Sequence, residues 1–437
     1  MSGENEDKKR SFYEEIQAVR ANADKGREPV FLPAQRGRRQ VSIKALMERI
    51  IGQFLAEYDA DALREADTET KRLKLILAAA DYVMNVESII VTQAEKADII
   101  QRVYNELFTY GALDSLFMNP DITTIVLDGA DKISVRYGHG DLTPIDPIFD
   151  DMEHFTRIIN RLLEDSGAVL TPEEPLIETG LIAHRRRISL SIAAPPITFQ
   201  INVDCRLHPV EPPRLDDLVQ AGVMPAFCAD ILTALVRSSH GVVIVGDTES
   251  GKTTLMGVLA RMLKGDGMIA VQRAAELDLT EGATSREVRW LQDGTVSFGQ
   301  QVADAIAELP QVMILDEVRA DEAFAIAPLL TASDAPRQLW TFRGPANSKR
   351  LTSALGMLAR RAAPDAGESA VNALYKRLPF VVTMRRRENA LQLYSISEWQ
   401  FTSGDYPDYV ELVSNGELTG KMPTLNLDLP EAFWKGG

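Results

Sequence analysis

The feature that most constrains the fold of this chain is an apolar run that leads into a glycine loop. Residues 242–245 read Val-Val-Ile-Val, and residues 246–254 read Gly-Asp-Thr-Glu-Ser-Gly-Lys-Thr-Thr. The loop matches the pattern G-x-x-x-x-G-K-[ST], and the residues that follow predict a helix over 253–263. A strand, a tight loop and a helix in this order are typical of an α/β fold, in which the strand lies in a buried, mostly parallel sheet.

The loop predicts a site for phosphate groups. Gly246 and Gly251 permit a tight turn, so that backbone N–H groups converge at the start of a helix, where the helix dipole favours negative charge. Lys252 is expected to reach the phosphates and the Thr253 hydroxyl to bind Mg²⁺. The candidate phosphate-binding residues are Gly246, Asp247, Thr248, Glu249, Ser250, Gly251, Lys252, Thr253 and Thr254.

Two loop residues work against such a site. Asp247 and Glu249 bring negative charge beside bound phosphate, which at about 7 Å costs about 2.4 kcal/mol per charge at an effective dielectric of 20. The cost is smaller where these side chains point outward. We therefore expect phosphate binding with an affinity that the loop's own charges lower.

A second acidic motif follows the phosphate loop. Residues 312–315 read Val-Met-Ile-Leu and precede Asp316 and Glu317, which is a Walker B pattern. In such sites one carboxylate holds Mg²⁺, directly or through water, and another polarises the attacking water. We assign the first role to Asp316 and the second to Glu317. Arg319 either senses the nucleotide or pairs with a neighbouring acid.

The remaining patterns divide the chain into five segments. Charge, proline and glycine without periodicity indicate a tail, apolar side chains every three to four positions indicate helices, and alternating runs indicate strands. The predicted segments are a flexible tail (1–40), a helical bundle (41–112), an α+β domain (113–208), a linker with an entry helix (209–223) and an α/β phosphate-binding domain (224–437).

Individual strands and one helix are expected inside the two larger domains. In the α+β domain, a helix is predicted at 151–165, and strands are predicted at 123–129, 132–138, 187–193 and 198–204. In the phosphate-binding domain, short apolar runs bounded by turns or charge predict parallel strands at 242–245, 268–271 and 312–315.

Composition narrows the classes of function. The 437 residues carry a net charge of −16, which argues against nucleic acid as the main partner because its phosphates need basic surface. Cys205 and Cys228 are too few for a disulfide framework and are predicted to be idle, buried thiols. The chain lacks a secretory signal and any apolar run of the roughly 18 residues that a membrane helix needs. We expect a cytoplasmic protein with no transmembrane segment.

Other candidate sites have less support. The five histidines are scattered without the spacing of a zinc site. No nucleophile elbow supports Ser-His-Asp catalysis. The three arginines at 185–187 either contact phosphate or form a solvated strand edge. The segment 425–434 either docks on a partner or packs on the chain's own surface, and we favour the second.

Together these motifs resemble the type II/type IV secretion ATPase superfamily. Their order is most similar to its CpaF-like branch, which drives tight-adherence (Flp-type) pili. The resemblance covers about residues 65–415. Besides the phosphate loop and the Walker B pattern, it rests on Y-G-A-L-D-S-L-F at 110–117, T-I-V-L-D-G at 124–129, P-L-I at 175–177, R-R-R at 185–187, L-D-D-L at 215–218, A-E-L at 275–277 and S-I-S-E at 395–398.

The resemblance implies an architecture and a mechanism. A PAS-like domain would be joined by a linker to a RecA-like P-loop ATPase domain, and six subunits would form a homo-oligomeric ring. ATP with Mg²⁺ would close the lobes and hydrolysis would reopen them. This motion would drive a pilus or an exported substrate through inner-membrane platform proteins, which places the protein at the cytoplasmic face of the inner membrane.

The resemblance also assigns residues. Lys252, Glu317 and Arg319 would be catalytic, and Thr253 and Asp316 would bind the metal. Three further residues would contact the nucleotide. They are Glu276, which remains from the family's acidic box, and Arg187 and Arg206 of the preceding domain.

The chain departs from the family pattern at several positions. The family's two adjacent acids, its T-x-H-A-N histidine, the glycine before the Walker B glutamate and several arginines are all replaced. The replacing residues are Gln272, Arg273, Arg343 and Asp316, with Asn202 at the end of the preceding domain and Gly299, Ala303, Ala307 and Leu309 before the Walker B strand.

These departures leave two functions open, because one arginine finger contributes 10³–10⁵ to the rate of phosphoryl transfer. The first is an ATP-hydrolysing motor of a pilus or secretion machine, with turnover lowered by the lost arginines. The second is a weakened nucleotide-binding subunit that regulates or scaffolds a partner ATPase. A phosphotransferase is disfavoured because the sequence shows no acceptor site.

Overall fold

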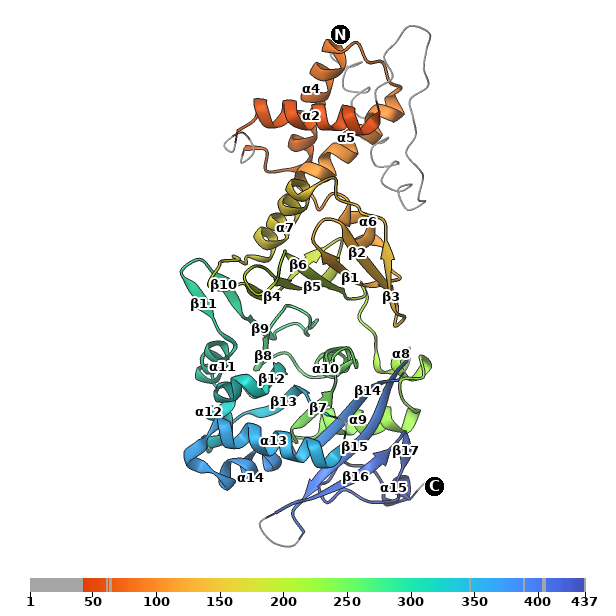
Figure 1. The fold of residues 1–437 in the computed structure, drawn as a ribbon. Helices are drawn as coiled ribbons and strands as arrows, with labels where there is room; N and C mark the ends of the chain where they lie inside the picture. The colour runs from red at the N-terminus through yellow and green to blue at the C-terminus, as the bar shows by residue number, and fades with distance from the viewer. Residues whose placement is uncertain are drawn as a thin grey trace. The chain divides into compact units, whose positions relative to one another are not determined.

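The chain folds into two compact units. The computed structural model describes residues 42–435 except 60–61, 63–64, 346, 388–389 and 403–405, so the tail predicted at 1–40 lies outside the described residues. The first unit comprises Met1–Asn119 and Ile148–Leu162, and the second comprises Pro120–Pro147 and Leu163–Gly437. The helices and strands drawn in Figure 1 confirm the mixed α/β class.

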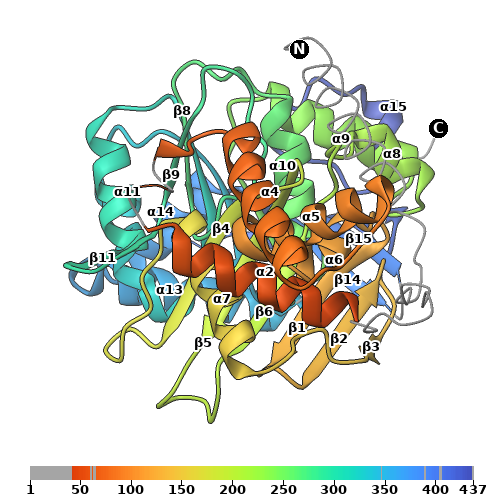
Figure 2. The same cartoon turned by 90° about the horizontal axis from the view of Figure 1, so that it is seen from above.

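Helices form the first unit, and Figure 2 shows three of them side by side. Ser42, Thr68 and Thr92 each cap one of these helices, because their side-chain oxygens accept a hydrogen bond from the first turn. Their apolar faces enclose one core, as the three-to-four-residue periodicity predicts. The helices are α2 (Ile43–Glu57), α4 (Glu69–Val86) and α5 (Gln93–Phe108), followed by the short α6 (Leu113–Met118).

The second unit contains a six-stranded antiparallel sheet with the strand order β3-β2-β1-β6-β5-β4. The strands predicted at 123–129, 132–138 and 187–193 and the helix predicted at 151–165 are found. The three strands are β1, β2 and β5 of the set β1 (Ile122–Asp128), β2 (Lys132–Tyr137), β3 (Leu142–Ile145), β4 (Leu176–Ala183), β5 (Arg186–Ala193) and β6 (Asn202–Leu207). The helix is α7 (Met152–Ser166), most of which belongs to the first unit.

The strand predicted at 198–204 is displaced along the chain. β6 begins only at Asn202, where its pairing with both β1 and β5 starts. Phe199, the most apolar residue before it, is fully exposed. The apolar character of 197–199 therefore does not mark a strand, because these side chains do not enter the sheet.

The second unit also contains a nine-stranded sheet, in the order β17-β16-β15-β14-β7-β13-β12-β8-β9. The pairs from β14 to β9 are parallel, and β14 to β17 pair antiparallel. The strands predicted at 242–245, 268–271 and 312–315 are β7, β8 and β12. The bounds are β7 (Val242–Gly246), β8 (Met268–Gln272), β9 (Thr284–Glu287), β12 (Val312–Val318), β13 (Arg337–Arg343), β14 (Phe380–Arg387), β15 (Ala390–Gln400), β16 (Asp408–Ser414) and β17 (Glu417–Leu418).

Helices cover both faces of this sheet (Figure 1). Along β7, Val242 and Ile244 belong to one core, whereas Val243 and Val245 belong to the other. Successive strand side chains point to opposite faces, so a continuous apolar strand requires a helical layer on each side. The first layer contains α8 (Leu215–Gln220), α9 (Ala226–Arg237) and α10 (Lys252–Arg261), and the second contains α11 (Phe298–Ala307), α12 (Ala327–Thr331), α13 (Ser348–Ala362) and α14 (Glu368–Arg377).

The C-terminal segment packs on the chain's own surface, as favoured from the sequence. Leu427 and Trp434 are buried in the core beside α9 and α10. The buried carboxylate of Glu398 accepts hydrogen bonds from the backbone N–H groups of Thr424 and Leu425. Of the two alternatives for this segment, the structure contains the strap.

Two expectations from composition can be compared with the described residues. Cys205 and Cys228 are both fully buried and free, as predicted. Burial raises the pKa of the Cys228 thiol to about 12, so it stays uncharged and unreactive at neutral pH. Within the described ranges, no helix combines the length and apolar character required to cross a membrane.

Candidate functional site

The predicted phosphate loop lies between the end of β7 and the start of α10. Gly246 closes the strand, and α10 begins at Lys252 rather than at the predicted residue 253. Gly251 has φ 88°, a left-handed conformation that favours glycine. A Cβ atom on Gly246 would collide with the Ser250 side chain and the Met384 carbonyl oxygen. Both glycines of the motif are thus required by the loop geometry.

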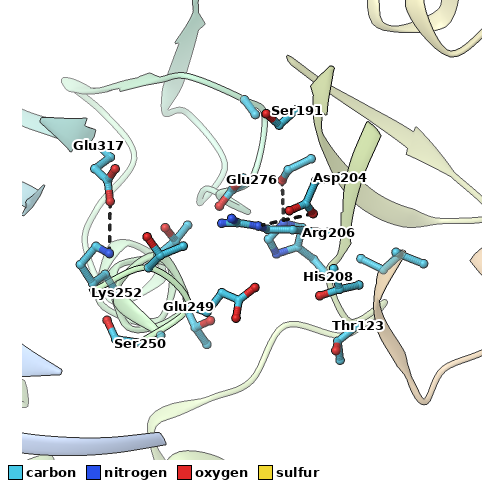
Figure 3. A pocket seen from close by; sticks show the side chains of 18 of the residues that line it. Thr123, Ser191, Asp204, Arg206, His208, Glu249, Ser250, Lys252, Glu276 and Glu317 are labelled. Atoms are coloured by element: carbon cyan, nitrogen blue, oxygen red, sulfur yellow. Dashed lines mark hydrogen bonds and ion pairs between the residues drawn. The ribbon is translucent and has the colours of Figure 1, made fainter. Parts of the chain in front are cut away.

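Lys252 is held by two oxygen atoms. Its ammonium nitrogen lies 3.1 Å from Oε2 of Glu317 and donates to the carbonyl oxygen of Asp247 at 2.9 Å. Only 6% of the Lys252 side chain is exposed, so its charge is compensated inside the protein. Figure 3 shows Lys252 and Glu317 pointing toward one another. The structure therefore joins the lysine of the first motif to the glutamate of the second.

Asp316 is the most deeply enclosed acid of the site. Its Oδ1 atom accepts hydrogen bonds from the hydroxyls of Thr253, at 3.2 Å, and Thr341. Burial and the nearby negative charge of Glu276 raise the pKa of Asp316 to about 7. Thr253 and Asp316, the two predicted metal ligands, are thus in direct contact.

Arg319 forms an ion pair rather than pointing freely into the site. Its guanidinium makes two hydrogen bonds of 2.8 Å to the carboxylate of Glu178 on β4, and its Nε lies 3.4 Å from Glu317. Burial lowers the pKa of Arg319, but the two carboxylates raise it more. Of the two alternatives for Arg319, the structure contains the ion pair, and its partner comes from the six-stranded sheet.

Arg273, which replaces an acid of the family pattern, is held in a similar way. Its Nε donates to the carbonyl oxygen of Glu317 at 3.0 Å, and its other nitrogens bind both carboxylate oxygens of Glu322. Gln272 beside it donates to Ser285 and accepts from the backbone of Leu277. These two replacements therefore stabilise the loops next to the site.

The two acids of the phosphate loop, Asp247 and Glu249, differ in their exposure to solvent and in their partners. Asp247 is exposed, and its carboxylate accepts only a local bond from the backbone of Thr248 among the described contacts. Glu249 turns the other way and binds Arg136 of β2 at 2.6 Å and Arg386 of β14 at 2.7 Å. Although burial raises the pKa of Glu249, the hydrogen bond and charge of Arg136 lower it overall. Glu249 therefore carries a full negative charge that two arginines compensate.

These side chains line one cavity of about 400 Å³ between the six-stranded sheet and the edge where the parallel strands end. Figure 3 shows Asp204, Arg206 and His208 on the side of β6, opposite Lys252. Most of the predicted residues line this cavity. They are Thr248, Glu249, Ser250, Gly251, Lys252, Thr253, Thr254, Arg206, Glu276, Asp316, Glu317 and Arg319.

Three of the predicted site residues do not line this cavity. Gly246 and Asp247 do not line the cavity, because Gly246 is buried in the strand end and Asp247 faces solvent. Arg187 lines a neighbouring cavity of about 180 Å³ and lies 3.1 Å from Asp278. That second cavity also contains Thr253, Thr254 and Glu276, so Arg187 is adjacent to the main cavity without lining it.

The sequence analysis missed three residues of the site. Arg136 and Arg386 bind Glu249, and Glu178 binds Arg319. Arg136 and Glu178 are charged residues within alternating strands, and Arg386 is the middle of three consecutive arginines at the end of β14. That pattern is a weak signal, and it gains meaning only once the partner across the cavity is known.

The cavity has the groups that a nucleotide phosphate and Mg²⁺ require. The hydroxyl oxygen of Ser250 is buried without a hydrogen-bond partner among the described residues, and no side chain caps the N-terminus of α10. Free N–H groups at a helix start suit an anion. The oxygens of Thr253 and Asp316 suit Mg²⁺, which binds few protein ligands and completes its shell with phosphate and water. Among the described residues, no group of three or more His, Cys, Asp or Glu could hold a metal by itself.

Comparison with known proteins gives one family. Residues 172–334 match the family model described as "Type II/IV secretion system protein". This segment contains the phosphate loop, the Walker B strand and Glu178. The match supports the resemblance to the type II/IV secretion ATPase superfamily.

Individual relatives are distant. An uncharacterized Bacillus anthracis protein is 24% identical in an alignment of 311 residues that covers 68% of this chain and 67% of that protein. A Mycobacterium tuberculosis protein, provisionally named a conjugal transfer protein, is 24% identical in an alignment of 330 residues that covers 70% of this chain and 93% of that protein. The solved ATPase DotB of Legionella pneumophila is 14% identical, with a TM-score of 0.48 over 68% of this chain and 81% of its own.

Proposed function

We propose that this chain is an Mg²⁺-dependent ATPase subunit of a pilus-assembly or protein-secretion machine. The single observation that carries the proposal is the convergence of two motifs about 60 residues apart in sequence. Lys252 of the phosphate loop contacts Glu317, and Thr253 contacts Asp316. Both pairs line the cavity at the ends of the parallel strands, which is where open α/β sheets bind their ligands.

Each residue has a role that follows from its chemistry. Lys252 and the N–H groups at the start of α10 would hold the phosphates, and Thr253 and Asp316 would hold Mg²⁺. Mg²⁺, when bound, neutralises charge that develops on the phosphate oxygens. Glu317 would accept a proton from the attacking water. For this to happen, the Glu317 carboxylate has to leave Lys252, so the observed ion pair corresponds to a resting arrangement.

Coupling to movement is part of the proposal. Three ion pairs join the six-stranded sheet to loops of the nine-stranded sheet around the cavity. They are Glu178 with Arg319, Arg187 with Asp278 and Arg136 with Glu249. A change in the charge of the cavity would change the balance of these contacts and move the two sheets relative to one another. We propose that the chain works in this way within a homo-oligomeric ring of the CpaF-like type, next to membrane platform proteins. We further propose the five-segment domain layout given above.

One set of contacts favours the second candidate function, a weakened nucleotide-binding subunit. Among the described contacts, Arg273 and Arg319 are the arginines that hydrogen-bond to Glu317, and both are already bound to carboxylates. An arginine held by an acid contributes less to stabilising the charge of a transition state. Such a site would bind ATP and hydrolyse it slowly, and would act on a partner ATPase.

Turnover of Mg-ATP by the purified full chain distinguishes the two candidates, with nucleotide binding measured on the same samples. Lys252→Ala is expected to lose binding and turnover, whereas Glu317→Gln is expected to lose turnover and still bind. Lys264→Ala removes an exposed lysine just beyond α10 and is the matched control. Wild-type turnover no higher than that of the Glu317→Gln variant would contradict the motor and leave the weakened subunit. Absence of nucleotide binding would contradict both.

A further inference from the structure

Glu249 occupies a position in the phosphate loop that is unfavourable for its residue type. Its φ is 59°, in the left-handed region where a residue other than glycine costs about 1–2 kcal/mol. Its carboxylate also places negative charge within the cavity that contains Lys252 and Thr253. Both features would weaken phosphate binding, so the contacts that Glu249 makes need to compensate them.

The contacts of Glu249 are made with two arginines from separate parts of the fold. Arg136 comes from β2 of the six-stranded sheet, and Arg386 comes from β14 beside the phosphate loop. Arg386 is oriented further by bonds to the carbonyl oxygens of His139 and Gly140. All three charged side chains are mostly shielded from solvent, with exposed fractions of 14% to 26%. Charge-assisted hydrogen bonds of this kind are the strong ones.

The two arginines are also suited to bind a phosphate. They line the same cavity as the phosphate loop. Arginine presents paired N–H donors that match the oxygens of a carboxylate and of a phosphate equally well. The Nε atom of Arg136 is buried without a hydrogen-bond partner among the described residues, so this guanidinium has a donor left for a further acceptor.

We propose that Glu249 acts as an internal substitute for a phosphate group, and that it thereby sets the selectivity of the site between nucleoside triphosphate and diphosphate. This inference rests on the proposed nucleotide site. Without nucleotide, the loop's own carboxylate holds Arg136 and Arg386. A bound triphosphate competes with Glu249 for both arginines and is repelled by its charge. A diphosphate carries one unit less of negative charge. Its binding affinity therefore increases less than that of a triphosphate when Glu249 is neutralised.

The test is a set of calorimetric titrations of the full chain, with Mg²⁺ and either ADP or a non-hydrolysable ATP analogue. Glu249→Gln is expected to bind the ATP analogue about tenfold more tightly, which corresponds to about 1.4 kcal/mol, and to bind ADP at most threefold more tightly. Glu249→Gly should behave likewise, because glycine accepts the left-handed conformation. Adding Arg386→Gln to Glu249→Gln should remove most of the gain.

Asp247→Asn is the matched control, since it removes one unit charge from the same loop where the side chain is exposed and contacts no arginine among the described residues. It is expected to shift either affinity by less than threefold. Equal shifts in the Asp247 and Glu249 variants, or unchanged or weaker binding of the ATP analogue by both Glu249 variants, would overturn the inference and leave the proposed function intact. No binding in wild type or any variant would overturn the proposed function, and the inference with it.

Discussion

The ion pair between Glu178 and Arg319 offers a direct test of how the two sheets are held together around the cavity. Glu178→Ala removes two hydrogen bonds of 2.8 Å between β4 and the segment after β12. A hydrogen bond to a charged group contributes about 1.5–3 kcal/mol where water is excluded. The two side chains are 29% and 31% exposed, so screening reduces the sum to about 2 kcal/mol for the pair.

Hydrogen exchange followed by mass spectrometry measures this contribution locally. Amides of β4 and of the segment Ala320–Ile326 are expected to exchange about 30-fold faster in Glu178→Ala, since 2 kcal/mol corresponds to that factor in the opening equilibrium. Raising the ionic strength to 1 M should reduce the difference from wild type, because the pair is partly exposed to screening ions. Glu173→Ala, which removes an exposed acid of the segment before β4, is the control.

Two results would refute this reasoning. Unchanged exchange in Glu178→Ala would mean that other contacts determine the opening of this region. Equal acceleration in Glu173→Ala would mean that the loss of any nearby negative charge, rather than of this ion pair, is responsible.

Three further variants have defined outcomes. Gly246→Ala should lower nucleotide affinity at least tenfold in a titration, because its Cβ would collide with groups behind the loop, whereas Gly257→Ala, with no neighbour closer than 3.7 Å, should not. Glu398→Ala should destabilise the C-terminal strap by about 1–3 kcal/mol and speed its proteolysis, since it removes the acceptor of two partly buried backbone N–H groups, whereas the exposed Glu417→Ala should have no effect. Burial lowers the pKa of His208 from 6.5 to about 4, so the stability due to its neutral form is present above pH 6.5 and is lost as the pH falls toward 4. His208→Gln should therefore reduce the loss of unfolding free energy over that interval by about 2–3 kcal/mol, measured by denaturant unfolding at several pH values; a loss as large as in wild type would contradict this.

The elements that the sequence predicts well are those determined by neighbouring residues. Apolar runs bounded by turns located β7, β8 and β12, and the pattern G-x-x-x-x-G-K-[ST] located the loop and α10 within one residue at its start. The strand predicted at 198–204 is displaced to 202–207, because Phe199 remains outside the sheet whereas Val203 is buried within it. The antiparallel strands β15 to β17 depend on pairing partners rather than on local pattern, and the sequence analysis did not predict them.

In the site, too, features set by neighbouring residues were predictable, whereas features set by distant contacts were not. Residues next to one another in a motif, such as Lys252 and Thr253, were found from spacing. The ion pairs of Glu178 and Glu249 were not, since their partners lie 137 to 141 positions away in the sequence for Arg319 and Arg386. No local pattern indicates which of the chain's many arginines faces a given acid, because only the packing of the two sheets brings them together.

The charges around the cavity bear on the two candidate functions. Several positions at which the superfamily usually has an arginine hold other residues in this chain. From the sequence alone, this indicated that the site had lost positive charge. In the structure, the cavity lining contains six arginines and Lys252 against six acids. The site is therefore rich in cations but close to neutral overall, and its positive side chains are largely held by carboxylates from its own walls.

A site of this kind stores its positive charge in ion pairs. Its affinity for a polyanion is lower than that of an open cluster of arginines, because each arginine that turns to a phosphate leaves an acid behind. This exchange of a carboxylate for a phosphate also makes the contacts around the cavity depend on the bound nucleotide. A bound triphosphate would release Glu249 and disturb the contacts that cross between the sheets. Weak binding and strong mechanical coupling are thus expected from one arrangement. Neutralising Glu249 should tighten nucleotide binding and weaken the coupling.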